Sequence, residues 1–293
     1  MKRKRLTITA GAATCLLAIA GFSSPGRATL GRVYSMLRGA APALAPPGSD
    51  IEQNARSKYG WANINTTQVR GVITFFDPTG AIARRANITF YQKHPDRLRV
   101  EIEQDGLILV QGCDSGDAWQ ARADSLSDDD QRNIRAWLRL WPDRLFDVRA
   151  AGGNYREVGR QVEDSKQGSP GRSPTDLRPA KQLDLVEVED TIGPGKIQKN
   201  PDRRTITYLI DRASTMVYSA RWMEPDDPNV EMREGTGTAT KQVQVDYESW
   251  RRVDGVLWPM EVTHRFGGRV DFRIDVKDVF VNPRLSEVVF QKP

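Results

Sequence analysis

Alternation of apolar and polar residues, bounded by glycine-containing turns, constrains the fold of this chain more than any other feature. In residues 270–277 four apolar residues alternate with four charged ones, and residues 97–104 repeat the same period. Because successive side chains of a strand point to opposite faces, this period predicts strands with one apolar and one polar face. Asp105-Gly106 and Gly267-Gly268 are two-residue signals for hairpins between such strands. The sequence therefore predicts a mainly β, antiparallel protein.

The predicted strands occupy most of the chain after residue 68. They span residues 69–76, 82–92, 97–104, 107–110, 118–121, 183–188, 205–210, 215–222, 238–250, 256–266 and 270–281. One helix stands out between them, from Asp128 to Trp141, with Ser127 as its N-cap and acidic residues in its first turn. Its apolar residues recur at helical spacing and include Ile134, Trp137, Leu138 and Trp141. Such a stripe either packs on the sheet or covers a ligand cavity, and both interpretations stay open.

The N-terminus has the three parts of an export leader. Four basic residues precede an apolar stretch over residues 6–22, and Gly26 and Ala28 suit cleavage after Ala28. A second small-residue site, Ala43-Leu44-Ala45, is followed by Pro46, which disfavours a cut there. We therefore predict a signal peptide at residues 1–28 and a periplasmic or otherwise exported protein. A retained N-terminal anchor is the alternative.

The exported chain is expected to have two parts. Residues 29–66 are predicted to form an N-terminal helical segment, with helices near residues 30–37 and 50–59 separated by a Pro-rich linker. Residues 67–293 are predicted to form one β domain, because all-β folds of this length are commonly single. Residues at about 165–180 are rich in Ser, Pro and Gly, which is typical of a flexible insertion.

Removal of the leader changes what the charge and the cysteines imply. The whole chain has 43 basic and 38 acidic residues, and five of the basic residues lie before residue 29. The remaining chain is balanced and lacks the basic field that supports nucleic-acid binding. Cys15 lies in the leader, so Cys113 has no partner for an intramolecular disulfide, and the two histidines lie far apart in sequence. We expect no nucleic acid, no metal and no cofactor.

Catalytic motifs are scarce in this sequence. It contains no Gly-x-Ser-x-Gly elbow, no His-Glu-x-x-His pair and no phosphate loop. His94 precedes Pro95 at a strand end, where a surface turn is the default interpretation, and His264 lies on an apolar strand face as a core or cavity histidine. A hydrolase that uses either histidine is compatible with their spacing, since catalytic triads assemble in space. We nevertheless predict a protein that is not an enzyme.

The hairpin around Gly267-Gly268 permits a prediction of register. A two-residue loop would pair Val262 with Arg273 and place the two apolar rows on opposite faces, which side-chain alternation disfavours. A three-residue loop, Phe266-Gly267-Gly268, pairs Val262 with Phe272 and also Met260 with Ile274. We predict that loop, with Gly268 at positive φ in a G1 bulge.

Four short motifs resemble a known family. They are Phe90-Tyr91-Gln92-Lys93-His94-Pro95 before Leu98-Arg99-Val100, Asp114-Ser115-Gly116-Asp117-Ala118-Trp119, Asp254-Gly255-Val256-Leu257-Trp258-Pro259, and Val281-Asn282-Pro283 with Phe290. Together with the order of the elements they make residues 67–293 similar to the LolA/LolB-like superfamily of periplasmic lipoprotein carriers, which also includes RseB-type regulators. In the carriers an Arg before the Pro of the first motif helps to latch a lid. His94 occupies that position here, so this latch is not implied for the present chain.

The resemblance implies a fold and a function. The fold is a single large curved antiparallel sheet that forms an incomplete barrel, with helices over its concave side. The function is the holding of acyl chains of lipids or lipoproteins in an apolar cavity. The alternative is a regulatory or interaction protein on the same scaffold, with a membrane-anchored protein as partner. We expect a monomer in either case.

Candidate residues follow from the alternation and from the resemblance. The ligand-cavity candidates are the inward apolar, aromatic and Met residues Leu98, Val100, Ile102, Tyr208, Met216, Tyr218, Trp222, Trp258, Met260, Val262, His264, Phe272 and Ile274. The lid candidates are Ile134, Trp137, Leu138, Trp141 and His94. Each cavity candidate has an alternative role as a core residue that fills space.

Overall fold

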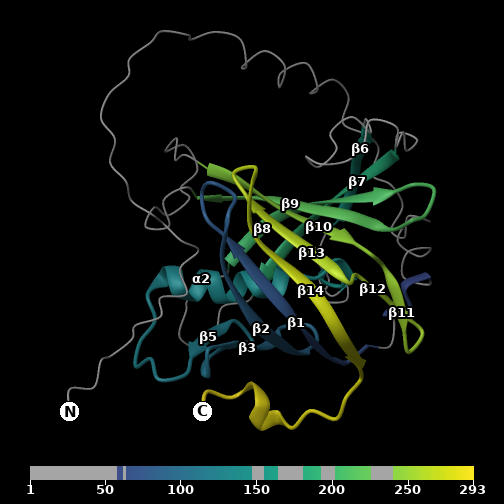
Figure 1. Ribbon diagram of the computed structural model, residues 1–293. Coiled ribbons are helices and arrows are strands. Elements are labelled where there is room, and N and C mark those ends of the chain that lie inside the picture. Colours follow the sequence, from purple (N-terminus) through teal and green to yellow (C-terminus); the bar gives the residue numbers. More distant parts are fainter. Residues whose placement is uncertain (1–57, 62–63, 147–154, 164–180, 193–201, 226–239) are drawn as a thin grey trace, which may run out of the picture.

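The computed structural model describes residues 58–61, 64–146, 155–163, 181–192, 202–225 and 240–293 (Figure 1). The predicted signal peptide, nearly all of the predicted N-terminal helical segment and the predicted insertion at about 165–180 lie outside these residues. Those assignments therefore stay predictions. Within the described ranges, no helix has both the length and the apolar composition needed to cross a membrane.

One antiparallel sheet of twelve strands dominates the fold, in the order β5-β4-β3-β2-β1-β14-β13-β10-β9-β8-β7-β6. Its strands are β1 (Thr66–Phe76), β2 (Ile82–Lys93), β3 (Arg97–Gln104), β4 (Leu107–Asp114), β5 (Asp117–Gln120), β6 (Tyr155–Glu163), β7 (Lys181–Ile192), β8 (Asp202–Asp211), β9 (Val217–Pro225), β10 (Thr240–Glu248), β13 (Glu261–Phe266) and β14 (Arg269–Val281). The sheet does not close into a barrel, because β5 and β6 are its two edges. The predicted fold class is confirmed.

Two strands were not predicted from the sequence. β6 has the sequence Tyr-Arg-Glu-Val-Gly-Arg-Gln-Val-Glu, with too few apolar residues to give a period. β11 (Arg251–Val253) pairs with β12 (Val256–Trp258) in a small separate hairpin around Asp254-Gly255. The predicted strand 256–266 is therefore divided into β12 and β13, which belong to different sheets.

The predicted helix begins where expected and ends early. α2 (Asp128–Ala136) starts with a capping box, in which the Ser127 hydroxyl accepts from the Asp130 N–H and the Asp130 carboxylate accepts from the Ser127 N–H. A 3-10 turn, η2 (Trp137–Arg139), then replaces the predicted last turn of α-helix. Pro142 disfavours the α conformation at the residue before it, which agrees with the change of geometry. Residues 128–146 are called the cover segment below.

The predicted three-residue loop of the β13–β14 hairpin is wrong. The argument behind it, that the two apolar rows must share one face of the sheet, is correct. Val262 pairs with Ile274 and His264 with Phe272, so the apolar rows share one face as predicted. The loop nevertheless has two residues, Gly267 and Gly268, both at positive φ as in a type I′ turn. A register shift next to His264 keeps the two apolar rows on the same face, because one residue of β14 has no partner in β13 there. The bulge lies inside the ladder instead of in the loop.

Most buried apolar residues lie on one face of the sheet, which is called the inner face below. Strand register groups them into rows across neighbouring strands, such as Phe90 with Val100 and Val262 with Ile274. The sheet bends so that the half with β1–β5 and the half with β6–β10 lie on either side of α2 (Figure 1). The cover segment thus occupies the inner face, and its buried residues Ile134, Leu138 and Trp141 belong to the same apolar cluster.

The C-terminus covers part of the opposite face. η3 (Glu287–Phe290) contacts β3 and β4, and the Trp119 indole donates to the Phe290 carbonyl at 3.1 Å. Glu287 pairs with both Lys93 and Arg97. This arrangement covers outward-facing Trp119.

Candidate functional site

The predicted cavity residues collect on the inner face, with a few exceptions. Eight are buried members of the apolar cluster: Leu98, Val100, Tyr208, Trp222, Trp258, Val262, Phe272 and Ile274. Three are partly buried and pack against it: Ile102, Met216 and Met260. Tyr218 and His264 are half-buried and stand outside the cluster. The sequence therefore located the apolar inner face, and its use as a ligand cavity stays a proposal.

Aromatic rings join the cover segment to both halves of the sheet. Trp141 is fully buried and meets Phe90 of β2 edge-on, with ring centroids 5.2 Å apart. On its other side it lies 5.5 Å from Trp258. Trp137, which is half-buried, contacts Phe90 and also Phe272 of β14. Aromatic pairs of this geometry add about 0.5–1.5 kcal/mol each beyond the area they bury. The cover segment is thus packed directly on the apolar floor.

A network of buried charges fastens the same segment to β7 and β8. The Arg139 guanidinium donates to the Asp190 carboxylate at 2.6 Å and to the Asp202 carboxylate at 2.9 Å. The Arg139 and Asp190 side chains are only 1% and 0% exposed. Both acids lie on the inner face. Asp190 follows Val186 and Val188 in the same alternating row, and Asp202 pairs with Ile192, the next residue of that row. The apolar face therefore contains two charges that are buried only because a partner reaches them.

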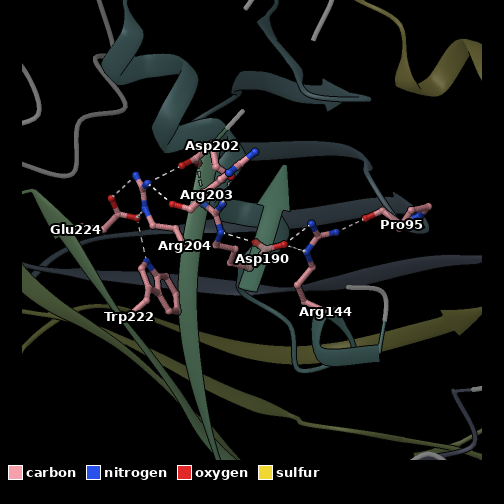
Figure 2. A network of polar contacts seen from close by, with 9 residues as sticks. Pro95, Arg144, Asp190, Asp202, Arg203, Arg204, Trp222 and Glu224 are labelled. Atoms are coloured by element: carbon pink, nitrogen blue, oxygen red, sulfur yellow. Dashed lines mark hydrogen bonds and ion pairs between the residues drawn. The ribbon is translucent and has the colours of Figure 1, made fainter. Parts of the chain in front are cut away.

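Arg144 extends this network to the other half of the sheet (Figure 2). Its guanidinium donates to Asp190 at 2.6 and 3.0 Å and to the Pro95 carbonyl, in the β2–β3 turn, at 2.7 Å. In the same turn His94 Nε2 lies 3.5 Å from an oxygen of Asp143, and both side chains are buried. His94 is therefore not the surface turn residue that the default interpretation expected. The predicted lid residue lies against the cover segment.

The network continues outward along β8 and β9. Arg204 pairs with Asp202 at 2.8 Å and with Glu224 at 3.0 Å, and the Trp222 indole donates to Glu224 at 3.0 Å. Figure 2 shows this chain of contacts running from Glu224 through Arg204 and Asp202, with Asp190 and Arg144 beyond. The ion pairs join three arginines to three carboxylates, so the network is neutral in total. A neutral, fully paired set avoids the large penalty of an isolated buried charge.

The charges of the network set the ionisation of its members. Burial alone would raise the pKa of Asp190, but Arg139 and Arg144 outweigh it and hold that pKa below its usual value. Burial acts on Asp202 in the same direction, and Arg139 and Arg204 likewise hold its pKa low. Burial alone would lower the pKa of Arg139, yet Asp202 and Asp190 keep it above its usual value. All three groups are therefore charged at neutral pH.

These pKa values predict a loss of stability in acid. A carboxyl group with a depressed pKa in the folded state stabilises the fold above its unfolded pKa of about 4, and this contribution is lost as the pH falls through the folded value. We expect the free energy of unfolding to decrease below about pH 4. Urea denaturation over a pH series measures this free energy. The Asp190→Asn variant is the reference, and its free energy of unfolding should fall less steeply in acid. Equal slopes for the two proteins would contradict this role of Asp190.

Sequence reasoning missed the network because it sought apolar residues on the inner face. A signal was present: Asp190 and Asp202 occupy positions whose alternation predicts apolar side chains. Arg135 and Arg139 are four residues apart in the cover segment, close to the Trp and Leu stripe. Charged residues in an apolar row of one element and in the apolar stripe of another predict that the two elements meet there.

The remaining candidate groups have structural roles. His264 stacks on Phe272, with ring centroids 4.5 Å apart, and lies 3.3 Å from Asp271. Burial raises the pKa of the Cys113 thiol to about 11, so this side chain is a neutral, inert part of the core. No group of three or more His, Cys, Asp and Glu side chains placed to hold a metal ion occurs in the described part of the chain.

Comparison with known proteins gives likeness in structure only. No family model matches the chain, and no curated protein matches it. A LolA superfamily protein from Nitrosomonas europaea is similar with a TM-score of 0.47 and 13% identity, over 85% of this chain and 99% of that one. A DUF1329 family protein from Desulfovibrio piger has a TM-score of 0.43 and 10% identity, over 83% and 96% of the two chains.

An outer membrane lipoprotein-sorting protein domain from Vibrio parahaemolyticus is also similar, with a TM-score of 0.47 and 9% identity, over 82% of this chain and 94% of that one. At such identities the likeness concerns the path of the chain and transfers no site residue.

Proposed function

We propose that this protein is an exported carrier that holds the acyl chains of lipids or lipoproteins against the inner face of its sheet. One observation supports this proposal above all. An apolar surface extends across both halves of an open twelve-stranded sheet, and in the part of the chain that the structure describes a short segment, residues 128–146, packs over it. The ion pairs that fasten this segment to the sheet are buried, and their charges would regain hydration if the segment moved away.

Physical chemistry makes exchange of the cover for an acyl chain feasible. Separation of the cover segment from the sheet exposes Phe90, Trp258 and their neighbours, which is costly in water. An acyl chain that takes the place of the cover buries the same surface and gains about 0.8 kcal/mol for each CH₂ removed from water. The Arg and Asp groups released at the same time regain their hydration. The cover therefore opens at lower cost when a chain is at hand to replace it.

The predicted context fits this activity. The leader at residues 1–28 predicts export from the cytoplasm. Outside the cytoplasm, lipids and lipoproteins pass between membranes. We propose that the carrier is not an enzyme, binds no nucleic acid, needs no metal or other cofactor and acts as a monomer. A membrane-anchored protein partner would accept or supply the cargo.

A second candidate is a regulatory or interaction protein on the same scaffold. The closed packing of the inner face favours it, because Trp141, Trp258 and Tyr208 are all 0% exposed. Such a protein would keep the inner face as its core and bind a membrane-anchored partner through its outer surface. Capture of that partner by protein free of lipid would support this candidate.

Titration with an environment-sensitive fluorescent fatty acid tests the carrier proposal. We expect saturable binding at one site that unlabelled acyl chains compete away. Ile102→Gln places a polar group at the half-buried margin of the inner face and should weaken binding about tenfold. Glu101→Gln, at the adjacent position on the opposite face, is the control and should bind as the parent protein does. Folded protein that gives no saturable signal would contradict the proposal.

A further inference from the structure

Five aromatic side chains of the apolar cluster carry polar groups that make no hydrogen bond within the described part of the chain. They are the indole N–H groups of Trp61, Trp141 and Trp258 and the hydroxyls of Tyr208 and Tyr247. The most exposed of them, Trp61, has only 6% of its surface accessible. Buried polar groups of folded proteins are nearly always paired, because an unpaired one loses its hydration without compensation. Five together on one surface therefore need a physical reason.

The three indoles form one contiguous group. Trp258 lies 5.5 Å from Trp141 of the cover segment and 5.8 Å from Trp61, between ring centroids. Trp61 also contacts Trp250, which in turn contacts Tyr247. The unpaired groups thus extend from the cover segment along the β11–β12 hairpin to β10.

The two tyrosines point to the inner face from strands that are separated by β9. Tyr208 of β8 stands in one row with Ala220 of β9 and Val245 of β10. Tyr247 is two residues beyond Val245 and therefore points to the same side of the sheet. Burial, followed by the charge of Asp190, raises the pKa of Tyr208, and burial raises the pKa of Tyr247. Both phenols are protonated and able to donate.

All five groups can donate a hydrogen bond. An indole N–H can only donate, and a phenol O–H can donate while it accepts. A ligand that satisfies them must offer acceptor oxygens, and it needs no donor of its own. Its remaining part must be apolar, because the donors belong to the same apolar cluster as Phe90, Val262 and Ile274. A hydrocarbon alone would leave every donor unpaired.

We propose that Tyr208, Tyr247 and Trp258 form the polar end of the acyl-chain site and donate hydrogen bonds to the acyl carbonyl oxygens of the cargo. This inference rests on the proposed carrier function and adds that the ligand is recognised as an ester or amide of a fatty acid. Ester-linked diacylglycerol lipids and acylated lipoproteins both present this group.

Competition against the fluorescent fatty acid tests the inference with a matched pair of ligands. Dipalmitoylglycerol has ester carbonyls, whereas dihexadecylglycerol has ether oxygens that accept weakly, at the same chain length. We expect the full-length protein to prefer the ester about tenfold. In the double variant Tyr208→Phe/Tyr247→Phe this preference should fall below about twofold. Tyr91→Phe, on the outer face where its hydroxyl donates to Glu101, should keep it.

The outcomes separate this inference from the carrier function. Equal affinity of the parent protein for ester and ether overturns the inference and leaves the carrier function intact, whereas binding of neither glyceride nor of a triacylated lipopeptide overturns the carrier function itself. The ligand-free double variant should be at least as stable as the parent. A clear loss of stability would mean that internal water already satisfies the hydroxyls and would also overturn the inference. A triacylated lipopeptide in the same assay assigns the cargo to lipoproteins if it binds more tightly than the diacylglycerol, and to lipids if it does not.

Discussion

Replacement of Asp190 by Asn is expected to lower the free energy of unfolding by about 3–5 kcal/mol. The Asp190 carboxylate accepts from Arg139 and from Arg144 and is fully buried between them. An amide of the same shape removes the charge that both guanidinium groups share, and Asp202 pairs with Arg139 alone of the two. Removal of one partner of a buried ion pair costs far more than the intact pair contributes. Urea denaturation followed by circular dichroism gives the value directly.

The matched control is Asp275→Asn, the same chemical change in an exposed pair. Asp275 lies 3.6 Å from Arg273, and both side chains are more than a third exposed. Exposed pairs of this kind contribute about 0.2–1 kcal/mol, so the two variants should differ severalfold. If both Asn variants lost the same small amount, the network would not be what fastens the cover segment to β7 and β8.

Trp141→Ala is expected to cost about 3–5 kcal/mol, the range measured for large aromatic side chains removed from cores. The Trp141 ring is fully buried and stands between Phe90 and Trp258, so its loss opens a cavity at the centre of the cover. The near-ultraviolet circular dichroism of the remaining indoles should weaken, because their packing becomes looser. Urea denaturation measures the cost, and near-ultraviolet spectra test the change in packing.

Trp137→Ala provides the comparison within the same segment. Trp137 touches Phe90 and Phe272 but is half-buried, so its removal should cost roughly half as much or less. Equal costs at the two positions would contradict the placement of Trp141 as the central contact between cover and sheet.

The strand pattern was accessible from the sequence because it depends on local chemistry. Side-chain alternation in Arg97–Gln104 and Val270–Val281 located β3 and β14 to within a residue. Ser127 and the acids after it located the start of α2 at the residue observed. These signals lie within a few residues of one another, and the tertiary structure reinforces them.

What escaped prediction depends on residues far apart in the chain. The loop around Gly267-Gly268 was misassigned because a bulge beside His264 shifts the strand register by one residue. Side-chain alternation requires that shift but does not show whether it occurs in the loop or within the strands. Arg139 and Asp190 are 51 residues apart, and the apolar row that each interrupts does not show which charge will be its partner. Only the bend of the sheet, which brings the cover segment between β2 and β7, makes them partners.

The cover segment connects the fold with the proposed activity. One arginine, Arg144, holds both Asp190 of β7 and the carbonyl of Pro95 in the β2–β3 turn. Any movement that uncovers the inner face must break these contacts together, since they share one side chain. We therefore expect opening to be cooperative, with the closed state protecting the apolar face in the absence of cargo.

The central claim, that the inner face receives acyl chains, is tested most directly by native mass spectrometry of the protein isolated from a cell envelope. The account predicts a population whose mass exceeds that of the chain by one acylated molecule, which organic extraction removes and which reappears on incubation with the lipid. A preparation that carries only the mass of the chain, and stays bare after incubation with acylated lipids and lipopeptides, would contradict the account.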